Sequence, residues 1–176
     1  QIVTFTFPHI GNVGTNYEEV EADSPHALGC FVREDVTAPS SLRALKPFDQ
    51  WLGDNGRSGL SGVDTRALTR RIREAGAPNA VIAHDPDGKF DIDELHGKAR
   101  AWAGLEGIDL AKEVTGHQTQ LWDKGGLWRL GHGYAPLEKI GASSTRPHVV
   151  GIAYGAKLKI FRNLLKAWLT VIRIQA

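Results

Sequence analysis

The most regular pattern of apolar and polar positions lies in residues 62–77. Leu68, Ile72 and Ala75 recur at spacings of four and three residues, which places them on one face of an α-helix. A second series with the same spacing, on nearly the opposite face, is basic: Arg66, Arg70 and Arg73. The pattern therefore predicts an amphipathic helix whose basic face points outward, towards solvent or a protein partner.

The ends of this helix carry recognisable signals. Thr65, or Asp64 before it, can cap the first turn because its side-chain oxygen accepts hydrogen bonds from backbone amides that lack helical partners. Gly76 can end the helix in the left-handed conformation. The apolar run at residues 80–83 predicts a strand directly afterwards. Together these signals predict a unit of helix, turn and strand.

Three strands and one short helix are predicted before this unit. Apolar residues alternate with threonines over residues 2–7, as in a half-buried strand, and residues 27–32 and 58–63 predict two more strands. Pro47 suits the first position of a helix over residues 47–52. The apolar face of that helix consists of Phe48, Trp51 and Leu52.

Two helices and a hairpin are predicted after residue 90. The first helix covers residues 92–102, with a stop at Gly104, and residues 109–114 predict a second short helix or a turn. The inner side of the longer helix consists of Leu95, Ala99 and Trp102. Residues 118–121 and 126–130 predict two strands joined as a hairpin by an Asp-Lys-Gly-Gly turn.

The last part of the chain predicts a β-α-β unit. It follows residues 131–147, which are rich in Gly, Ser, Thr and Pro and indicate a domain boundary. Residues 148–152 and 171–174 predict its strands, and the helix between them has a strongly apolar face formed by Ile160, Phe161, Leu164, Leu165 and Trp168. Such a face needs a sheet of more than two strands to cover it. The exposed strand edge at residues 149–152 predicts poor solubility.

Composition narrows the class of protein. The 176 residues are 41% hydrophobic, enough for one domain with a core or one domain and a piece of another. A net charge of +1 gives no strong field for nucleic acid or an anionic membrane, and no apolar run is long enough to span a bilayer. The single cysteine excludes an internal disulfide and suits the cytoplasm, where we expect the protein to reside.

Two candidate catalytic features have simpler structural interpretations. The loop at residues 11–16 is rich in glycine and asparagine, as in a phosphate cradle, but it lacks the lysine of a P-loop. His9, just before it, has no evident carboxylate partner. Cys30 lies in an apolar strand with no nearby base, so we expect a buried, inert thiol.

One acidic segment invites a test for calcium. Several oxygen donors and one glycine fall at the right positions of a calcium loop counted from Ala83: Asp85, Asp87, Gly88, Asp91 and Glu94. Ala83 itself has no side-chain oxygen to serve as first ligand. The segment therefore favours a Pro-Asp-Gly turn followed by an Asp N-cap. His132 and His148 lack the spacing of metal ligands.

Three separated stretches carry a resemblance to a known family. Residues 7–16 read FPHIGNVGTN, residues 62–83 read GVDTRALTRRIREAGAPNAVIA, and residues 107–114 read GIDLAKEV. In this order they resemble segments of the small, glutamine-hydrolysing subunit of carbamoyl phosphate synthetase, which include YPHIGNVGTN and GxDLAxxV. The resemblance covers residues 1 to about 165. It departs from the family at Ala153, where the family has aspartate, and at Leu158 and Lys159.

This resemblance implies a fold and a division into domains. The implied class is α/β (α+β). Residues 1–135 would form the amino-terminal domain of swivelling β/β/α type, lacking its first strands, and residues 136–147 a linker. Residues 148–176 would form the truncated start of a flavodoxin-like class I glutamine amidotransferase domain.

The resemblance also implies a function. The family's small subunit hydrolyses glutamine through a cysteine thioester, assisted by a histidine and a glutamate. The ammonia passes to a large subunit that makes carbamoyl phosphate from bicarbonate and ATP, for arginine and pyrimidine biosynthesis. In the family the catalytic residues lie beyond the position of residue 176, and part of the glutamine site lies before Gln1. No catalytic, substrate-binding or metal-binding residue is therefore carried over to this chain.

We accordingly expect a fragment of the glutaminase subunit that is inactive alone and limited to docking on the large subunit. ATP and magnesium would belong to the large subunit, so no cofactor is expected in this chain, and glutamine would bind only in the full-length parent. Neither nucleic acid nor a membrane is expected as a partner. The alternative is a non-catalytic binding or scaffold protein that reuses the same domain.

Overall fold

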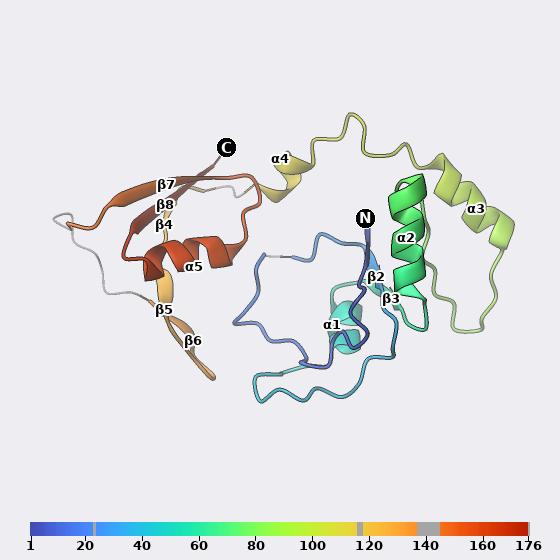
Figure 1. Ribbon diagram of the computed structural model, residues 1–176, viewed down its shortest axis with the longest axis horizontal. Helices are drawn as coiled ribbons and strands as arrows, with labels where there is room; N and C mark the ends of the chain where they lie inside the picture. The colour runs from blue at the N-terminus through green and yellow to red at the C-terminus, as the bar shows by residue number, and fades with distance from the viewer. Residues whose placement is uncertain (23, 116–117, 137–144, 176) are drawn as a thin grey trace. The chain divides into compact units, whose positions relative to one another are not determined.

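The computed structural model describes residues 1–22, 24–115, 118–136 and 145–175 (Figure 1). The chain divides into two compact units. The first unit contains residues 1–16 and 24–106, and the second contains residues 17–23 and 107–176. No helix in the described part of the chain is long and apolar enough to cross a membrane.

A small parallel sheet forms the centre of the first unit. Its strands are β1 (Ile2–Thr4), β2 (Gly29–Phe31) and β3 (Ser58–Leu60), in that order across the sheet. All three predicted strands are confirmed, although each is shorter than its apolar pattern. Beyond Thr4, the amide of Phe5 still donates to the carbonyl of Phe31 at 3.0 Å, and the Pro8 carbonyl accepts from the amide of Glu34 at 3.4 Å.

Helix α1 (Phe48–Asp54) packs on this sheet at β3. Pro47, predicted as the first helical residue, lies instead at the N-cap, one position before the helix begins. The rings of Phe48 and Trp51 stack with centroids 6.0 Å apart. Leu52 packs against Gly59 of β3 so closely that a Cβ at Gly59 would lie 3.1 Å from the Leu52 Cδ1. The predicted helix and its half-buried apolar face are therefore confirmed.

The amphipathic helix predicted from the sequence is α2 (Thr65–Ala75). Asp64 is its N-cap, with a side-chain oxygen accepting from the amide of Ala67 at 3.0 Å. Gly76 ends the helix with a positive φ of 84°, as predicted, but its ψ of 168° is extended and not that of the left-handed helical conformation. Leu68 and Ile72 are half-buried, whereas Ala75 is exposed. The apolar stripe is thus only partly covered within the first unit.

The strand predicted at residues 80–83 is wrong. These residues form no strand. Ile82 is half-buried, and its side chain lies beside Gly29 of β2, where an added Cβ would meet the Ile82 Cγ2 at 3.4 Å. An apolar run indicates that side chains are buried. Here the burial occurs without the backbone hydrogen bonds to a neighbouring strand that define a β-strand.

Helix α3 (Ile92–Ala101) confirms the next predicted helix, with Asp91 as its N-cap. It ends at Trp102, whose backbone is extended, before reaching the predicted stop at Gly104. Leu95 and Ala99 are half-buried, but Trp102 is exposed, so only part of the predicted inner side is covered.

The second unit contains a three-stranded sheet in the order β4-β8-β7. Strands β7 (His148–Ala153) and β8 (Thr170–Gln175) are parallel and joined by helix α5 (Leu158–Lys166), which confirms the predicted β-α-β unit. Strand β4 (Gln120–Leu121) pairs antiparallel with β8. The short helix α4 (Leu110–Val114), capped by Asp109, also confirms its prediction.

The predicted hairpin of residues 118–121 with 126–130 is wrong, because β4 pairs with β8. Strand β5 (Lys124–Arg129) instead forms a hairpin with β6 (Gly133–Pro136). Gly131 and Gly133 supply positive φ values of 76° and 66° at that turn. Strand β6 lies inside the Gly-rich stretch that indicated a boundary. The predicted linker over residues 136–147 falls mostly outside the described residues, so the division at that point stays a prediction.

The core of the second unit lies between α5 and the strands. It consists of Trp122, Ala153, Phe161, Leu165 and Val171. The rings of Trp122 and Phe161 are 5.5 Å apart, and α5 packs against β5 and β8. Of the apolar face predicted for α5, Ile160 and Trp168 remain exposed.

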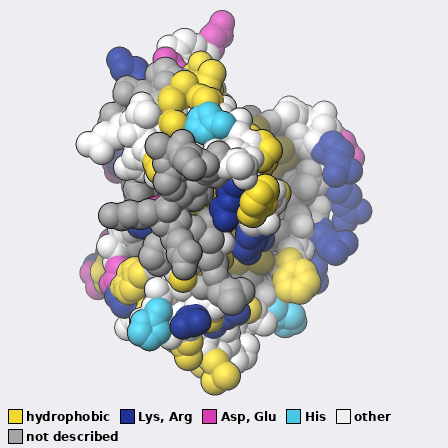
Figure 2. Space-filling model, turned by 90° about the vertical axis from the view of Figure 1, so that its left-hand side faces the viewer, with side chains coloured by type: hydrophobic (Ala, Val, Ile, Leu, Met, Phe, Trp, Pro, Cys, Tyr) yellow, Lys and Arg dark blue, Asp and Glu magenta, His cyan; other side chains and the backbone are white. Residues whose placement is uncertain are grey.

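The other face of this sheet is uncovered within the second unit. Val150 and Ile152 of β7 are 53% and 58% exposed, and Leu121 of β4 is 58% exposed. Strand β7 is one of the two outer strands of this sheet among those described, in agreement with the free edge predicted there. Exposed hydrophobic side chains are visible beside basic ones on the face drawn in Figure 2.

Candidate functional site

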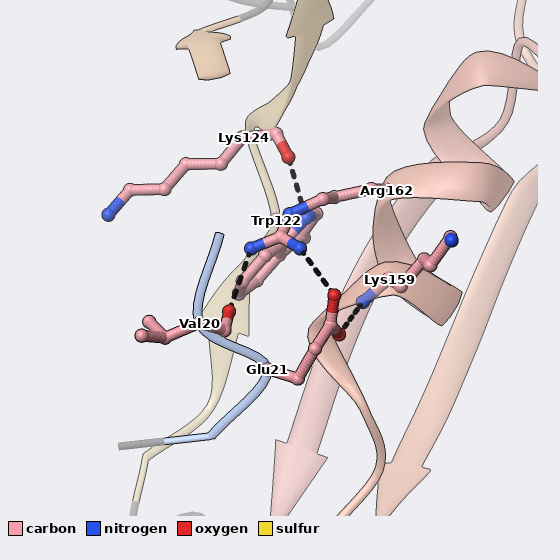
Figure 3. Close-up of polar contacts among 6 residues, drawn as sticks. All are labelled: Val20, Glu21, Trp122, Lys124, Lys159 and Arg162. Carbon is pink, nitrogen blue, oxygen red and sulfur yellow. Dashed lines mark hydrogen bonds and ion pairs between the residues drawn. The ribbon is translucent and has the colours of Figure 1, made fainter. Parts of the chain in front are cut away.

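A buried arginine organises the polar side of the second unit (Figure 3). Arg162 on α5 is only 6% exposed. One of its terminal nitrogens donates to the Glu21 carboxylate at 3.0 Å, and the other donates to the carbonyl of Val20 at 3.2 Å. Its guanidinium also lies over the ring of Tyr134, 4.4 Å from the centroid. Two terminal nitrogens are thus fixed, and the cation faces an aromatic surface.

Glu21 also holds the start of helix α5. Its second carboxylate oxygen accepts from the backbone amide of Lys159 at 2.8 Å. The N-cap residue Lys157 makes no side-chain capping bond, so a distant residue performs that role. A carboxylate suits this place because amides at a helix N-terminus carry partial positive charge. Glu21 therefore joins residues 17–22 to α5, because its carboxylate accepts hydrogen bonds from both the Lys159 amide and the Arg162 guanidinium.

Trp122 fixes the neighbouring strands. Its indole N–H donates to the carbonyl of Lys124 at 3.2 Å (Figure 3). Its ring packs on Phe161 in the core. The turn between β4 and β5 is thereby held against α5. This arrangement places the backbone of β5 beside the Arg162 cluster, by which we mean Arg162 and its partners Val20, Glu21 and Tyr134.

A cavity of about 810 Å³ opens beside this cluster, and we call it the basic cavity. Four basic side chains line it: Lys124, His132, Arg162 and Arg173. Aromatic side chains contribute further walls: Tyr17, Trp122 and Tyr134. Glu18 is the acidic side chain among its described lining residues. The cavity thus combines positive charge with ring surfaces, which is chemistry suited to an anion that carries an apolar or aromatic group.

The first unit holds a second cavity of about 600 Å³, between α1 and the sheet, with Cys30 and His84 among its walls. Cys30 is 4% exposed, and burial raises the pKa of its thiol above the ordinary value. The prediction of a buried thiol is confirmed. Because a nucleophilic cysteine needs a lowered pKa, this environment works against thiolate chemistry.

The glycine-rich loop at residues 11–16 is a packed structural loop. Gly11 has φ of 89°, and a Cβ there would lie 2.8 Å from the Cβ of Phe48. The amide and hydroxyl of Ser40 both donate to the carbonyl of Asn12, at 2.8 and 3.0 Å. His9 is exposed at the start of this loop. These contacts support the structural interpretation of the loop.

The acidic segment after residue 84 forms the predicted turn and cap. One Asp85 oxygen accepts from the amides of Asp87 and Lys89, at 2.9 and 3.1 Å. Asp91 accepts from the amide of Glu94 at 2.9 Å. Among the described residues, no group of three or more His, Cys, Asp or Glu side chains is placed to hold a metal ion.

The remaining predicted polar residues lie apart from one another. His148 on β7 contacts the hydroxyl of Thr170 at 2.9 Å, whereas His132 lines the basic cavity. The arginines of α2 are exposed in the first unit, as predicted. The sequence analysis missed Glu21, Arg162 and Arg173. The available signal was Arg162 itself, a charged residue directly beside Phe161 within a strongly apolar helix.

Comparison with known proteins identifies relatives along the whole chain. Residues 1–82 match the family model described as "Carbamoyl-phosphate synthase small chain, CPSase domain". A carbamoyl phosphate synthase small chain from Zymomonas mobilis is 56% identical over 176 residues, which is 100% of this chain and 46% of that relative. The small chain from Mesorhizobium japonicum is 51% identical over 179 residues, covering 98% of this chain and 43% of its own length.

A third relative gives the same result. The small chain from Agrobacterium fabrum is 50% identical over 167 residues, 92% of this chain and 40% of that relative. The resemblance inferred from the sequence motifs is therefore confirmed: the chain is similar to carbamoyl phosphate synthase small chains. It spans less than half the length of these relatives.

Proposed function

We propose that this chain is a portion of the glutamine-hydrolysing small chain of a carbamoyl phosphate synthase. In that enzyme the small chain would supply ammonia from glutamine for carbamoyl phosphate synthesis, in the arginine and pyrimidine pathways. The observation that carries this proposal is 56% identity to one small chain over all 176 residues. A match of this extent places the two units of this chain in a single small-chain sequence.

The proposal extends to the fold. Residues 1–135 would correspond to the swivelling β/β/α-type domain, residues 136–147 to a linker, and residues 148–176 to the start of a flavodoxin-like amidotransferase domain. Two observations support the last assignment. Strands β7 and β8 are parallel and joined by α5, and the sheet face carrying Val150 and Ile152 is uncovered. A doubly wound sheet has helices on both faces, so this face would be covered by further elements.

The role proposed for the chain itself is binding. Its single cysteine is buried with a raised pKa, which argues against a thioester-forming nucleophile among these residues. The chain would dock on the synthase large chain in the cytoplasm, where the large chain would hold ATP and magnesium. Glutamine hydrolysis would belong to the full-length parent.

The test is co-elution with the synthase large chain in size-exclusion chromatography. We expect a complex that elutes earlier than either component. A matched control uses bovine serum albumin in place of the large chain, and it should give two separate peaks. Separate elution of a folded, monodisperse chain from the large chain would contradict docking and favour the alternative of a scaffold protein that reuses the domain.

A second assay addresses catalysis. We expect no ammonia release when the purified chain is incubated with glutamine. Release that disappears in the Cys30→Ser variant would overturn the assignment of this chain to a non-catalytic role.

A further inference from the structure

We propose that the basic cavity of the second unit binds a small phosphate ester that carries an aromatic or heteroaromatic ring. The inference rests on three features of the cavity: its unbalanced charge, the state of Arg173, and its ring-bearing walls. It is independent of the proposed docking on a large chain, because the cavity lies within one unit of this chain.

The charge of the cavity is unbalanced among its described lining residues. Arg162 is neutralised by Glu21, as its 3.0 Å ion pair shows. The side chains of Lys124, His132 and Arg173 make no ion pair in the described part of the chain. Lys124 and Arg173 thus share the cavity with the His132 imidazole and one acid, Glu18, so the described lining carries an excess of positive charge that a bound anion would offset.

Arg173 is the strongest indication of an absent ligand. Its Nε is wholly buried and has no hydrogen-bond partner among the described residues, a state that it shares with the Nε of Arg162 in the same cavity; unlike Arg162, however, Arg173 has no carboxylate partner in the described part of the chain. The central carbon of its guanidinium lies 6.0 Å from the centroid of the Phe161 ring. The contact identified for this cation among the described residues is therefore with an aromatic ring and not with an acid. A buried donor without an acceptor is costly, and a guanidinium fork matches the oxygens of a phosphate. Arg173 is therefore the residue expected to bind the phosphate.

Lys124 and Arg173 come from elements that the core holds in place. Arg173 lies on β8 opposite Gln120 of β4, and both line the cavity. Lys124 begins β5, where its carbonyl accepts from the Trp122 indole. Sites on such elements are preorganised, so little conformational entropy would be lost when an anion binds.

The walls of the cavity favour a ligand with a ring. Tyr17 is 61% exposed beside the cavity, and Tyr134 is fixed under the Arg162 guanidinium. A volume of about 810 Å³ is within the range of organic ligand sites and far more than one phosphate group requires. A ring could therefore stack on a tyrosine while its phosphate reaches Arg173.

The experiment is a titration of the full chain with phenyl phosphate, followed by intrinsic tryptophan fluorescence in 150 mM salt. Phenol and inorganic phosphate are the comparison probes. We expect phenyl phosphate to bind at least about tenfold more tightly than either probe, since each probe retains only one of the two recognised groups. Equal affinity for inorganic phosphate and phenyl phosphate would overturn the part of the proposal that concerns the ring.

Variants then locate the binding. Arg173→Gln should weaken phenyl phosphate by about tenfold or more, the loss expected for a charge-assisted hydrogen bond. Arg71→Gln removes an exposed arginine from α2 in the first unit, and it should leave the affinity unchanged. Equal weakening by both variants, or by neither, would overturn the proposal.

Lys124→Gln covers the case in which Arg173→Gln fails to fold. Lys124 is exposed, so its replacement should preserve the fold, as circular dichroism would report. We expect it to weaken phenyl phosphate by up to about fivefold, the effect of a partly screened charge. An unchanged affinity in a folded Lys124→Gln chain would contradict the proposed site.

Discussion

The two units of this chain are held together in different ways. In the first, the helices α2 and α3 begin at aspartates that cap amides three residues away, and the sheet has strands of three residues. In the second, a compact apolar cluster is combined with an ion pair between Arg162 and Glu21, which are 141 residues apart in the chain. Both units pair strands that are distant in the sequence, but helices α2 and α3 of the first unit are capped locally, whereas the start of α5 in the second is held by a residue far away in the chain.

This difference matters for function. The first unit presents a basic helix face and a half-covered apolar stripe, features suited to a protein partner. The second unit builds a cavity from strands, a helix and residues 17–20, and Arg162 fastens this last segment through Val20 and Glu21. A cavity of this kind requires long-range contacts because no single segment supplies all of its walls.

The largest effect should follow removal of a core ring from the second unit. Phe161→Ala would delete the contact with Trp122 and the ring beneath Arg173. We expect a loss of about 4 kcal/mol in the free energy of unfolding, typical of a buried phenylalanine. Urea denaturation followed by tryptophan fluorescence measures this loss. A change below about 1 kcal/mol would show that the described core does not stabilise the unit.

Breaking the ion pair should have the next largest effect. Arg162→Ala leaves Glu21 without its partner and Tyr134 without its stacked cation. We expect about 2 kcal/mol of destabilisation, because Arg162 is buried but the Glu21 side chain is 37% exposed, so water can partly solvate the remaining carboxylate. Arg71→Ala on α2 is the matched control and should change stability by less than about 0.5 kcal/mol. Similar losses for the two variants would contradict the special role of Arg162.

These two variants probe contacts that sequence patterns cannot reveal. Caps such as Asp64 and Asp91 were predictable because the donor and the acceptor lie within three residues. The pairing of β4 with β8 and the tie of Glu21 to Arg162 depend on segments brought together only by folding. A pattern of burial is also ambiguous, because Ile82 is half-buried without belonging to a strand.

A local change in the first unit should have a smaller effect. Asp91→Ala removes the acceptor of the Glu94 amide and the cap of α3. We expect a loss of about 1 kcal/mol, confined to the stability of that helix. Amide hydrogen exchange along α3 measures the change. Asp91→Asn is the control that keeps a capping oxygen and should lie near the wild type.

The smallest effect is a dependence on pH at the start of α2. The hydrogen bond from the Ala67 amide lowers the pKa of Asp64 below its ordinary value. Since the folded pKa lies below the unfolded one, the stabilisation is present above the unfolded pKa and is lost as pH falls through the folded value. Helix exchange rates measured between neutral and acidic pH should show this loss, and Asp64→Asn should remove the dependence at that site.

The contrast between local and long-range stabilisation is tested most directly by hydrogen exchange of the full chain carrying Glu21→Gln. This variant keeps the shape of the side chain and removes its charge. We predict faster amide exchange in the first turns of α5, where Glu21 meets Lys159 and Arg162, and unchanged exchange in α2. Unchanged exchange in α5, or equal acceleration in α2, would contradict the account of a second unit held by its long-range ion pair.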